Sequence, residues 1–296
     1  MDYVILRILC SFICGVLISQ TGSFIQLGTL NILASPSTLG FDGVAILWML
    51  VFHSALLYFG WAHNPLYFLL SGLPLFVLFG FSFTKMLKGK MRFERLVLLG
   101  LTFNLFVGVI FSLWQFLFLA FNLPFPIELW FGHFRFVHSQ ALLILILAEL
   151  LLLVGLRYFW NELNLFSLGE GISQNWKLKE KSLYAFLFLS VSLATFVVVS
   201  LFGAFSFLGL IFPIVARELW FTKFDLKGEL LWGSLVNGLF LMVMDYLCYQ
   251  FPIFGAEIPV GLIVTAVGAV SLIVLLWNAS DRPFHPHSEL LAKPRK

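Results

Sequence analysis

This chain has 296 residues, of which 60% are hydrophobic and only 11% are charged. A soluble domain could not remove that much apolar side-chain surface from water, so the composition excludes a soluble protein and indicates a membrane protein. The net charge of +3 gives no indication of a nucleic-acid partner. The cations are better explained as determinants of membrane topology.

Apolar segments follow one another along the whole chain. Most run for about 20 residues without interruption, which is typical of membrane-spanning helices and not of the short alternating strands of a barrel. The segments are residues 7–27, 40–59, 65–84, 96–121, 140–158, 182–202, 206–220, 229–250 and 259–277. We therefore expect an all-α, polytopic membrane protein with about nine transmembrane helices. The seventh segment is short, and whether it crosses fully is left open.

Glycine pairs interrupt the first and last apolar segments. Gly15 and Gly22 are seven residues apart, as are Gly261 and Gly268, so each pair lies on one stripe of a helix. Such stripes let two helix backbones approach closely. We expect helix packing at these glycines rather than direct contact with a substrate.

The basic residues gather in alternate connections between the apolar segments. Sixteen of the 18 lysine and arginine residues fall on one side of the membrane if all nine segments cross. They are Lys85, Lys88, Lys90, Arg92, Arg95, Arg157, Lys177, Lys179, Lys181, Arg217, Lys223, Lys227, Arg282, Lys293, Arg295 and Lys296. Because cytoplasmic loops carry the excess of basic residues, we expect the C-terminus to be cytoplasmic and the N-terminus to be periplasmic.

The segments on the opposite side are rich in aromatic residues, proline and asparagine. Their tryptophans suit an interfacial belt, and residues 121–140 are long enough for a short helix lying on the membrane. Arg7 and Arg135 are the two cations of this side.

Residues 159–182 form the longest polar stretch on the basic side. Gly169 and Gly171 stand among helix-forming residues, so short helices around a turn are expected. The stretch also contains the apolar residues Leu163, Leu165, Phe166 and Leu168. They either dock into the groove of another protein or fold back onto the ends of the spanning helices, and the residues alone favour neither alternative.

Residues 203–219 and 255–277 are apolar but interrupted by glycine and proline, and each has a charge at one end. Lipid tolerates irregular backbone only where protein or a water-lined cavity covers it, so the pattern favours moving parts beside a pathway. Arg217 is expected to bind helix C-terminal carbonyls or to face a partner. Glu257, just before Pro259, is expected to cap the last helix.

Asp245 lies within the eighth apolar segment. An intramembrane carboxylate marks a functional site by default, but a hydrogen bond to a neighbouring helix explains it as well and is preferred. The chain contains no Gly-x-x-x-x-Gly-Lys-Ser/Thr phosphate loop, so an ATP site is expected on another chain. The six histidines lack metal-site spacing, and we expect no metal, cofactor or catalytic site here.

Five motifs occur in the order known from one transporter family. They are GVLISQTGSFIQ (15–26), LASPSTLGFDGVA (33–45), NELNLFSLGE (161–170), FLGLIFPIVAR (207–217) and EIPVGLIVTAVGA (257–269). Through them the chain resembles, from about residue 4 to 278, the FecCD-type permeases of ATP-binding-cassette (ABC) importers for iron-siderophores, heme and cobalamin. That family normally has ten spans, and its first helix is absent from this sequence. Ile214 replaces a family histidine, and of two family arginines only Arg7 is kept.

The resemblance implies roles for particular residues. The loop that couples to the ATPase would comprise Leu163, Asn164, Phe166, Leu168, Gly169 and Glu170. The translocation path, or the helix packing around it, would involve Gly15, Gly22, Gln26, Pro36, Gly40, Gly209, Pro213, Arg217, Asp245, Glu257, Pro259, Gly261 and Gly268. Arg7 and Arg135 would dock a periplasmic binding protein, with a topology-fixing interfacial anchor as the alternative for Arg7.

The resemblance also implies an assembly in the bacterial inner membrane. Residues 1–280 would form a single permease domain, and residues 281–296 a short cytoplasmic tail. Its partners would be ABC ATPase subunits, a periplasmic substrate-binding protein and a second permease copy or paralogue in a dimer. Two alternatives stay open. A zinc or manganese ABC permease would want histidine or carboxylate clusters in the spans, and a proton- or sodium-driven carrier would want several buried ionisable residues, for which Asp245 and Glu149 are the candidates.

Overall fold

A computed structural model describes residues 3–59, 65–88, 93–122, 130–167, 180–220, 226–252 and 256–279. Within these ranges the regular secondary structure is helical, which confirms the predicted all-α class. The helices are α1 (Tyr3–Thr29), α2 (Phe41–Phe59), α3 (Pro65–Lys88), α4 (Phe93–Ala120), α5 (Ser139–Tyr158), α6 (Trp160–Ser167), α8 (Glu180–Phe202), α9 (Leu208–Trp220), α10 (Leu226–Gly228), η2 (Glu229–Gly233), α11 (Ser234–Gln250) and α12 (Val260–Ala279).

Every predicted apolar segment lies on a helix. Six helical stretches in the described residues are long and apolar enough to cross a membrane: α1, α4 from Arg95, α5, α8 from Lys181, most of α3, and the continuous α10–η2–α11 segment. Three apolar stretches are shorter: Phe41–Leu56 in α2, Leu208–Arg217 in α9 and Val260–Val274 in α12.

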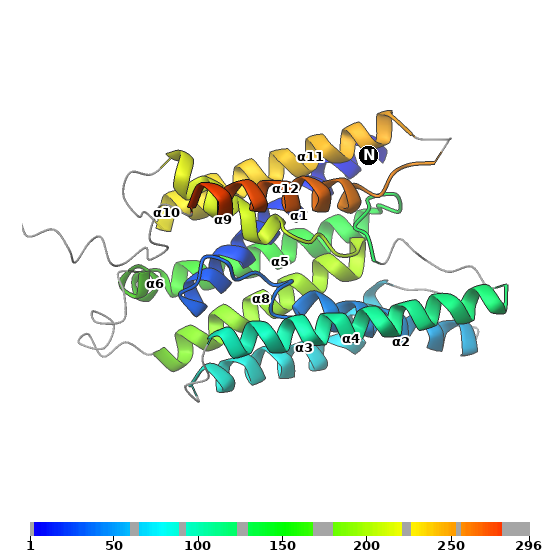
Figure 1. The fold of residues 1–296 in the computed structure, drawn as a ribbon, viewed down its shortest axis with the longest axis horizontal. Helices are drawn as coiled ribbons and strands as arrows, with labels where there is room; N and C mark the ends of the chain where they lie inside the picture. The colour runs from blue at the N-terminus through cyan, green and yellow to red at the C-terminus, as the bar shows by residue number, and fades with distance from the viewer. Residues whose placement is uncertain are drawn as a thin grey trace, which may run out of the picture.

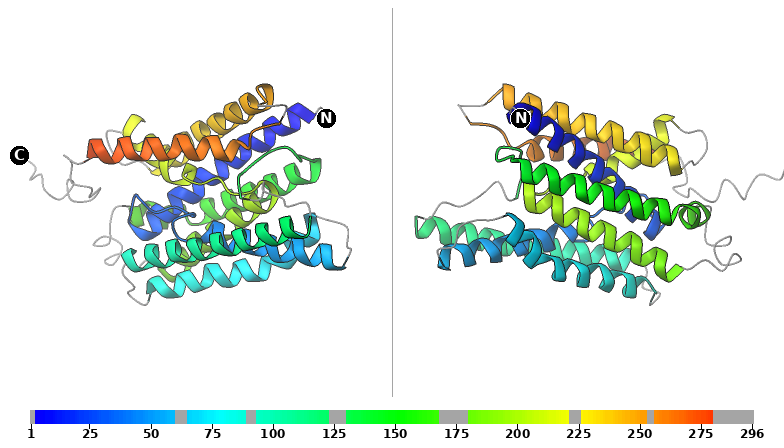
Figure 2. Two further views of the ribbon diagram at one scale, coloured as in Figure 1. Left: turned by 45° about the vertical axis from the view of Figure 1, so that its right-hand side comes forward. Right: turned by 180° about the vertical axis from the view of Figure 1, so that it is seen from behind.

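The long helices run roughly side by side, with α1 at the centre (Figure 1). α1 packs against α9 and α11 on one side and against α5 and α8 on the other. α8 in turn packs against α2 and α3, and α4 covers α2 (Figures 1 and 2). Because α1 is enclosed in this way, its residues 17–28 are all buried, polar ones included.

The outermost helices expose apolar side chains. On α4, Leu105 is 73% exposed, and on α5, Leu151 is 74% exposed. Lipid tails are as apolar as leucine, so a membrane protein loses nothing by presenting such residues to them. These faces are therefore suited to contact with lipid or with another membrane-embedded chain.

The two ends of the bundle differ in charge. One end, here the α6 end, holds α6, α10 and the ends of α3, α5 and α9, and the opposite end holds the start of α1 (Figure 1). The described basic residues of the predicted clusters belong to the α6 end. They are Lys85, Lys88, Arg95, Arg157, Lys181, Arg217 and Lys227.

Two local features differ from the sequence-based predictions. Residues 130–138 contain no helix, because Gly132 and His133 instead donate backbone hydrogen bonds to the Ala204 and Phe202 carbonyls at 2.9 and 2.8 Å. The predicted interfacial helix over 121–140 is therefore wrong for the described part of that segment. The π-helix η2 was not predicted, and π-helical turns often occur at functional sites.

Candidate functional site

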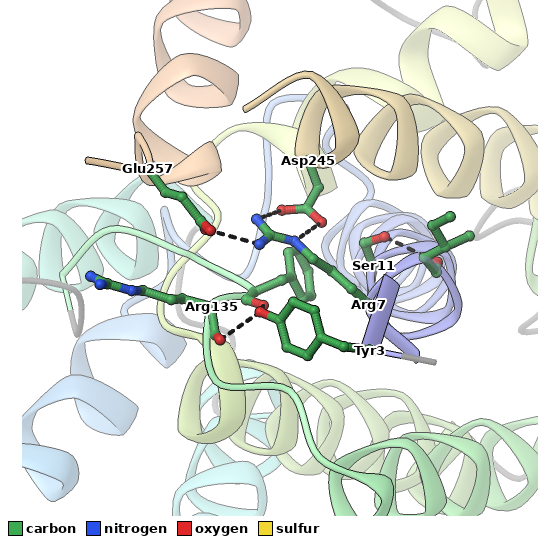
Figure 3. Close-up of polar contacts among 8 residues, drawn as sticks. Tyr3, Arg7, Ser11, Arg135, Asp245 and Glu257 are labelled. Carbon is green, nitrogen blue, oxygen red and sulfur yellow. Dashed lines mark hydrogen bonds and ion pairs between the residues drawn. The ribbon is translucent and has the colours of Figure 1, made fainter. Parts of the chain in front are cut away.

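A buried ion cluster lies where the start of α1 meets α11 and the segment before α12 (Figure 3). Arg7 donates from Nε and Nη2 to the two carboxylate oxygens of Asp245, at 2.7 and 2.8 Å. Its Nη1 donates to Glu257 Oε2 at 2.9 Å. The guanidinium also lies 4.9 Å from the ring centre of Tyr249. One arginine thus joins three segments through charge-assisted hydrogen bonds, one pair of them bidentate.

This placement contradicts the expectation that Arg7 presents a free docking charge. Arg7 and Asp245 are only 4% and 1% exposed, and the guanidinium is occupied within the molecule. Asp245 makes the expected bond to a neighbouring helix. Glu257 pairs with Arg7 and keeps 27% of its side chain exposed, and the expected capping of α12 by this residue stays a prediction.

Arg135 lies close to the ion cluster but points away from it. Its backbone carbonyl accepts a hydrogen bond from the Tyr3 hydroxyl at 2.6 Å. Its exposed side chain extends outward (Figure 3), with the guanidinium 5.6 Å from the ring centre of Phe136. A docking role for this side chain remains a prediction.

α1 crosses α9 at two glycines. A Cβ atom on Gly22 would overlap the carbonyl oxygen of Gly209, so only glycine permits this approach. One turn further along α1, the buried Gln26 donates from Nε2 to the Leu210 carbonyl at 3.0 Å. Backbone contact and a buried amide therefore fix the short helix α9 against α1.

The other residues assigned to the path or its packing also lie at close contacts between elements. These contacts are Gly15 with Asn237, Pro36 with Gly209, Gly261 with Gly132, and Gly268 with Phe207. Gly40 has a φ of 85° at the turn into α2, a conformation that favours glycine. Pro213 lies inside α9, and Pro259 directly precedes α12.

The first part of the predicted coupling loop forms the helix α6. It is seen nearly end-on in Figure 1, so it lies across the end of the bundle. Leu163 and Phe166 are 0% and 2% exposed, and the Phe166 ring packs edge-on against Tyr184 of α8 with the ring centres 5.5 Å apart. Of the two alternatives for this stretch, its described half folds back on the spanning helices. Leu168, Gly169 and Glu170 lie outside the described residues.

A small polar cavity of about 30 Å³ lies near α6, between α1, α9 and η2. Ser23, Gln26, Arg217 and Glu229 contribute to its lining. Arg217 Nε donates to the Pro213 carbonyl at 3.1 Å, as expected for an arginine at a helix C-terminus, and lies 3.5 Å from Glu229 Oε2. This pair joins α9 to η2 where the last residue of α6 also reaches the cavity.

Sequence reasoning missed several residues of these sites. Glu229 and Asn237 are 3% and 0% exposed, and both are polar residues within an apolar segment, the same signal that singled out Asp245. Tyr3 offered no such signal. It precedes the first predicted segment, and its role depends on contact with Arg135, 132 positions away.

Comparison with known proteins identifies relatives along nearly the whole chain. The model of the FecCD transport family matches residues 1–278. The chain is 27% identical over 271 residues to the petrobactin import system permease protein YclN of Bacillus subtilis, covering 91% of this chain and 83% of YclN. It is 25% identical over 281 residues to the vitamin B12 import system permease protein BtuC of Vibrio cholerae, covering 93% and 81%.

Two solved structures share the fold. A metal-chelate type ABC transporter in an inward-facing conformation matches with a TM-score of 0.71 at 24% identity, covering 93% of this chain and 85% of that one. PsaBC from Streptococcus pneumoniae matches with a TM-score of 0.63 at 14% identity, covering 98% and 96%.

Proposed function

The chain belongs to the FecCD transport family, and we propose on that premise that it carries an iron-siderophore, heme or cobalamin-like chelate across the bacterial inner membrane. It is a permease subunit of an ABC importer and has no catalytic activity of its own. The single observation that carries the proposal is the family match over residues 1–278. That membership disfavours the proton- or sodium-driven carrier.

The α6 end is the cytoplasmic end in this proposal. Its support is the concentration of lysine and arginine there, which the positive-inside rule associates with the cytoplasm. The ATPase would bind α6 together with residues 168–182, and the binding protein would approach the opposite end, where Arg135 is exposed.

A second permease copy or a paralogue would complete the translocation path. The cavity near α6 measures about 30 Å³, and another between α1, α2 and α8 about 20 Å³. Each has room for roughly one or two waters, far less than a metal chelate needs. A path between two chains would supply that space.

Affinity purification tests the assembly. The tagged chain, expressed in its own host and extracted in mild detergent, should retain an ABC ATPase through purification. Copies of an unrelated multi-pass protein with the same tag provide the control. Recovery of the chain without an ATPase, under conditions that keep a known importer of this type intact, would contradict the proposal.

Uptake measurements test the substrate class. Cells that express the assembly are offered a ferric siderophore, hemin, cyanocobalamin, and bare zinc or manganese ions. The proposal expects ATP-dependent accumulation of at least one chelate. Accumulation of the bare ions alone would favour the zinc or manganese alternative.

A further inference from the structure

Contacts at the N-terminal end of the bundle form a closed ring that links three parts of the chain. Tyr3 and Arg7 lie one turn apart on α1. The Tyr3 hydroxyl holds the Arg135 carbonyl at 2.6 Å, and Arg7 holds Glu257 at 2.9 Å. Figure 3 shows both bonds reaching from the same face of α1.

The ring closes between the two segments that α1 holds. Gly261, in the first turn of α12, donates its backbone N–H to the Gly132 carbonyl at 2.7 Å. A Cβ on Gly261 would meet the backbone of Gly132, so these two segments touch without intervening side chains. We call the six residues of the ring the outer clasp: Tyr3, Arg7, Gly132, Arg135, Glu257 and Gly261.

The two carboxylates that bind Arg7 differ in how firmly they hold it. Asp245 is 1% exposed, binds through both oxygens, and sits on α11, which packs along α1. Glu257 binds through a single oxygen, keeps 27% of its side chain exposed, and lies outside any helix. Water can replace Arg7 at Glu257, whereas at Asp245 both partners would be left unpaired in an apolar interior.

The Tyr3 contact is also replaceable. The short bond joins uncharged groups and its acceptor is exposed, and the hydroxyl has only one further, longer contact, with the Phe134 carbonyl at 3.4 Å. The Gly261–Gly132 bond joins two backbone groups at the same end. The ring therefore has two bonds that can exchange with water, those of Glu257 and Tyr3, beside a buried backbone bond and a buried ion pair.

We propose that the outer clasp is a conformational lock that keeps the outer end of α12 against α1 and the 130–138 segment. The lock is closed in this structure. It opens when Glu257 leaves Arg7 and the Tyr3 bond exchanges with water, which frees the buried Gly261–Gly132 contact to separate, while Arg7 stays paired with Asp245 throughout. Because the buried charge never loses its partner, opening avoids the large penalty of an isolated intramembrane charge. That the clasp faces the outside of the cell rests on the proposed function, whereas its opening does not.

Distances between spin labels on the purified chain test the lock. Labels are placed at Ser139, at the start of α5, and at Leu262, on α12; both positions are exposed. The three native cysteines are replaced by alanine. The variants are Tyr3→Phe, Glu257→Gln and the double substitution. Tyr246→Phe is the matched control. It removes a tyrosine hydroxyl at the clasp end of the bundle, on α11, from a residue that is not part of the clasp.

The double variant should raise the population with the longer separation by about tenfold, the expected result of losing a hydrogen bond to a charged group. The single variants should shift it less, and the control should leave it unchanged. The same distances in all variants, or an equal shift in the control, would overturn the proposal.

Comparison of Glu257→Gln with Asp245→Asn shows whether the Glu257–Arg7 bond is a lock or only a structural contact. Asp245→Asn is the reference for the loss of a structural contact. It should lower the melting temperature, whereas Glu257→Gln should leave that temperature nearly unchanged and alter the distances. If Glu257→Gln lowers the melting temperature as much as Asp245→Asn and leaves the distances unaltered, the contact is structural and the proposal is wrong. The sample contains no ATPase, binding protein or chelate, so this outcome is independent of the experiments on the proposed function.

Discussion

Arg7 shows how much one side chain can organise when it is an arginine. Its planar fork offers donors in fixed directions, so it binds Asp245 through two atoms and Glu257 through a third. A lysine has one charged nitrogen on a flexible stem and could not reproduce this geometry. The buried charges are tolerated because each of the three guanidinium nitrogens donates a hydrogen bond to a carboxylate.

Breaking the Arg7–Asp245 pair from one side should destabilise the protein strongly. Asp245→Leu leaves a buried guanidinium with only Glu257, and removal of one partner of a buried pair typically costs about 3–5 kcal/mol. We expect a clear fall in the melting temperature of the detergent-solubilised chain, followed by tryptophan fluorescence. The combined Arg7→Met, Asp245→Leu variant should recover most of the loss, since no fully buried charge is left unpaired and the partly exposed Glu257 can bind water. A double variant as unstable as the single one would contradict this account.

The α1–α9 crossing predicts a sharp difference between two glycines. Gly22→Ala would place a methyl group on the Gly209 carbonyl, which is backbone and cannot rotate away. At Gly108 the nearest atom would be a Trp130 ring carbon at 3.5 Å, an ordinary contact. Gly22→Ala should therefore reduce the yield of folded protein in size-exclusion chromatography, whereas Gly108→Ala should match the parent. Equal yields would mean that the crossing is looser than described.

At the scale of elements, α6 has one face buried against its own molecule and one face that is partly exposed. Leu163 and Phe166 are buried against the bundle, whereas Asn161 is exposed and Leu165 is half-buried. α6 lies across the end of the bundle and contacts α8 through the Phe166 and Tyr184 rings. A displacement of α6 can therefore be passed on to α8. The buried apolar residues thus anchor α6, and on the proposed function its outward face would bind the ATPase.

Substitutions on the two faces of α6 should have separable effects. Phe166→Asp should lower the melting temperature, because it places a charge in a core contact. Leu165→Asp, and Leu168→Asp combined with Gly169→Asp, should abolish ATPase co-purification while the melting temperature stays close to that of the parent. Normal co-purification from the Leu168/Gly169 variant would exclude this segment as the docking site.

Elements were more predictable than the contacts between them. The apolar segments were found because a membrane span must be continuously apolar, a property visible in a single sequence. The π-helix η2 could not be predicted, because the change of hydrogen-bond register that defines it leaves no signal in the amino-acid composition. The pairing of Arg7 with Asp245 could not be predicted, because 238 positions separate the two residues and a single sequence does not show which helices are neighbours.

For the whole molecule, the arrangement of charge implies an orientation. The fold brings the described ends of α3, α5, α9 and α10 together at the α6 end (Figure 1), and these are the connections that carry the basic residues. Moving lysine and arginine across a membrane is costly, so the basic end should stay in the compartment of synthesis. The clasp end would then face the binding protein.

Labelling of introduced cysteines in intact cells would establish that orientation. The native Cys10, Cys14 and Cys248 are 0%, 0% and 3% exposed, so they should contribute little background. Ser139→Cys, at the clasp end, should react with a membrane-impermeant maleimide before the inner membrane is broken. Asn161→Cys, on α6, should react only afterwards. Both positions are exposed polar residues within a turn of a helix start, so local reactivity should be similar and the order of labelling should report the side. The reverse order would invert the topology and place α6 where no ATPase could reach it.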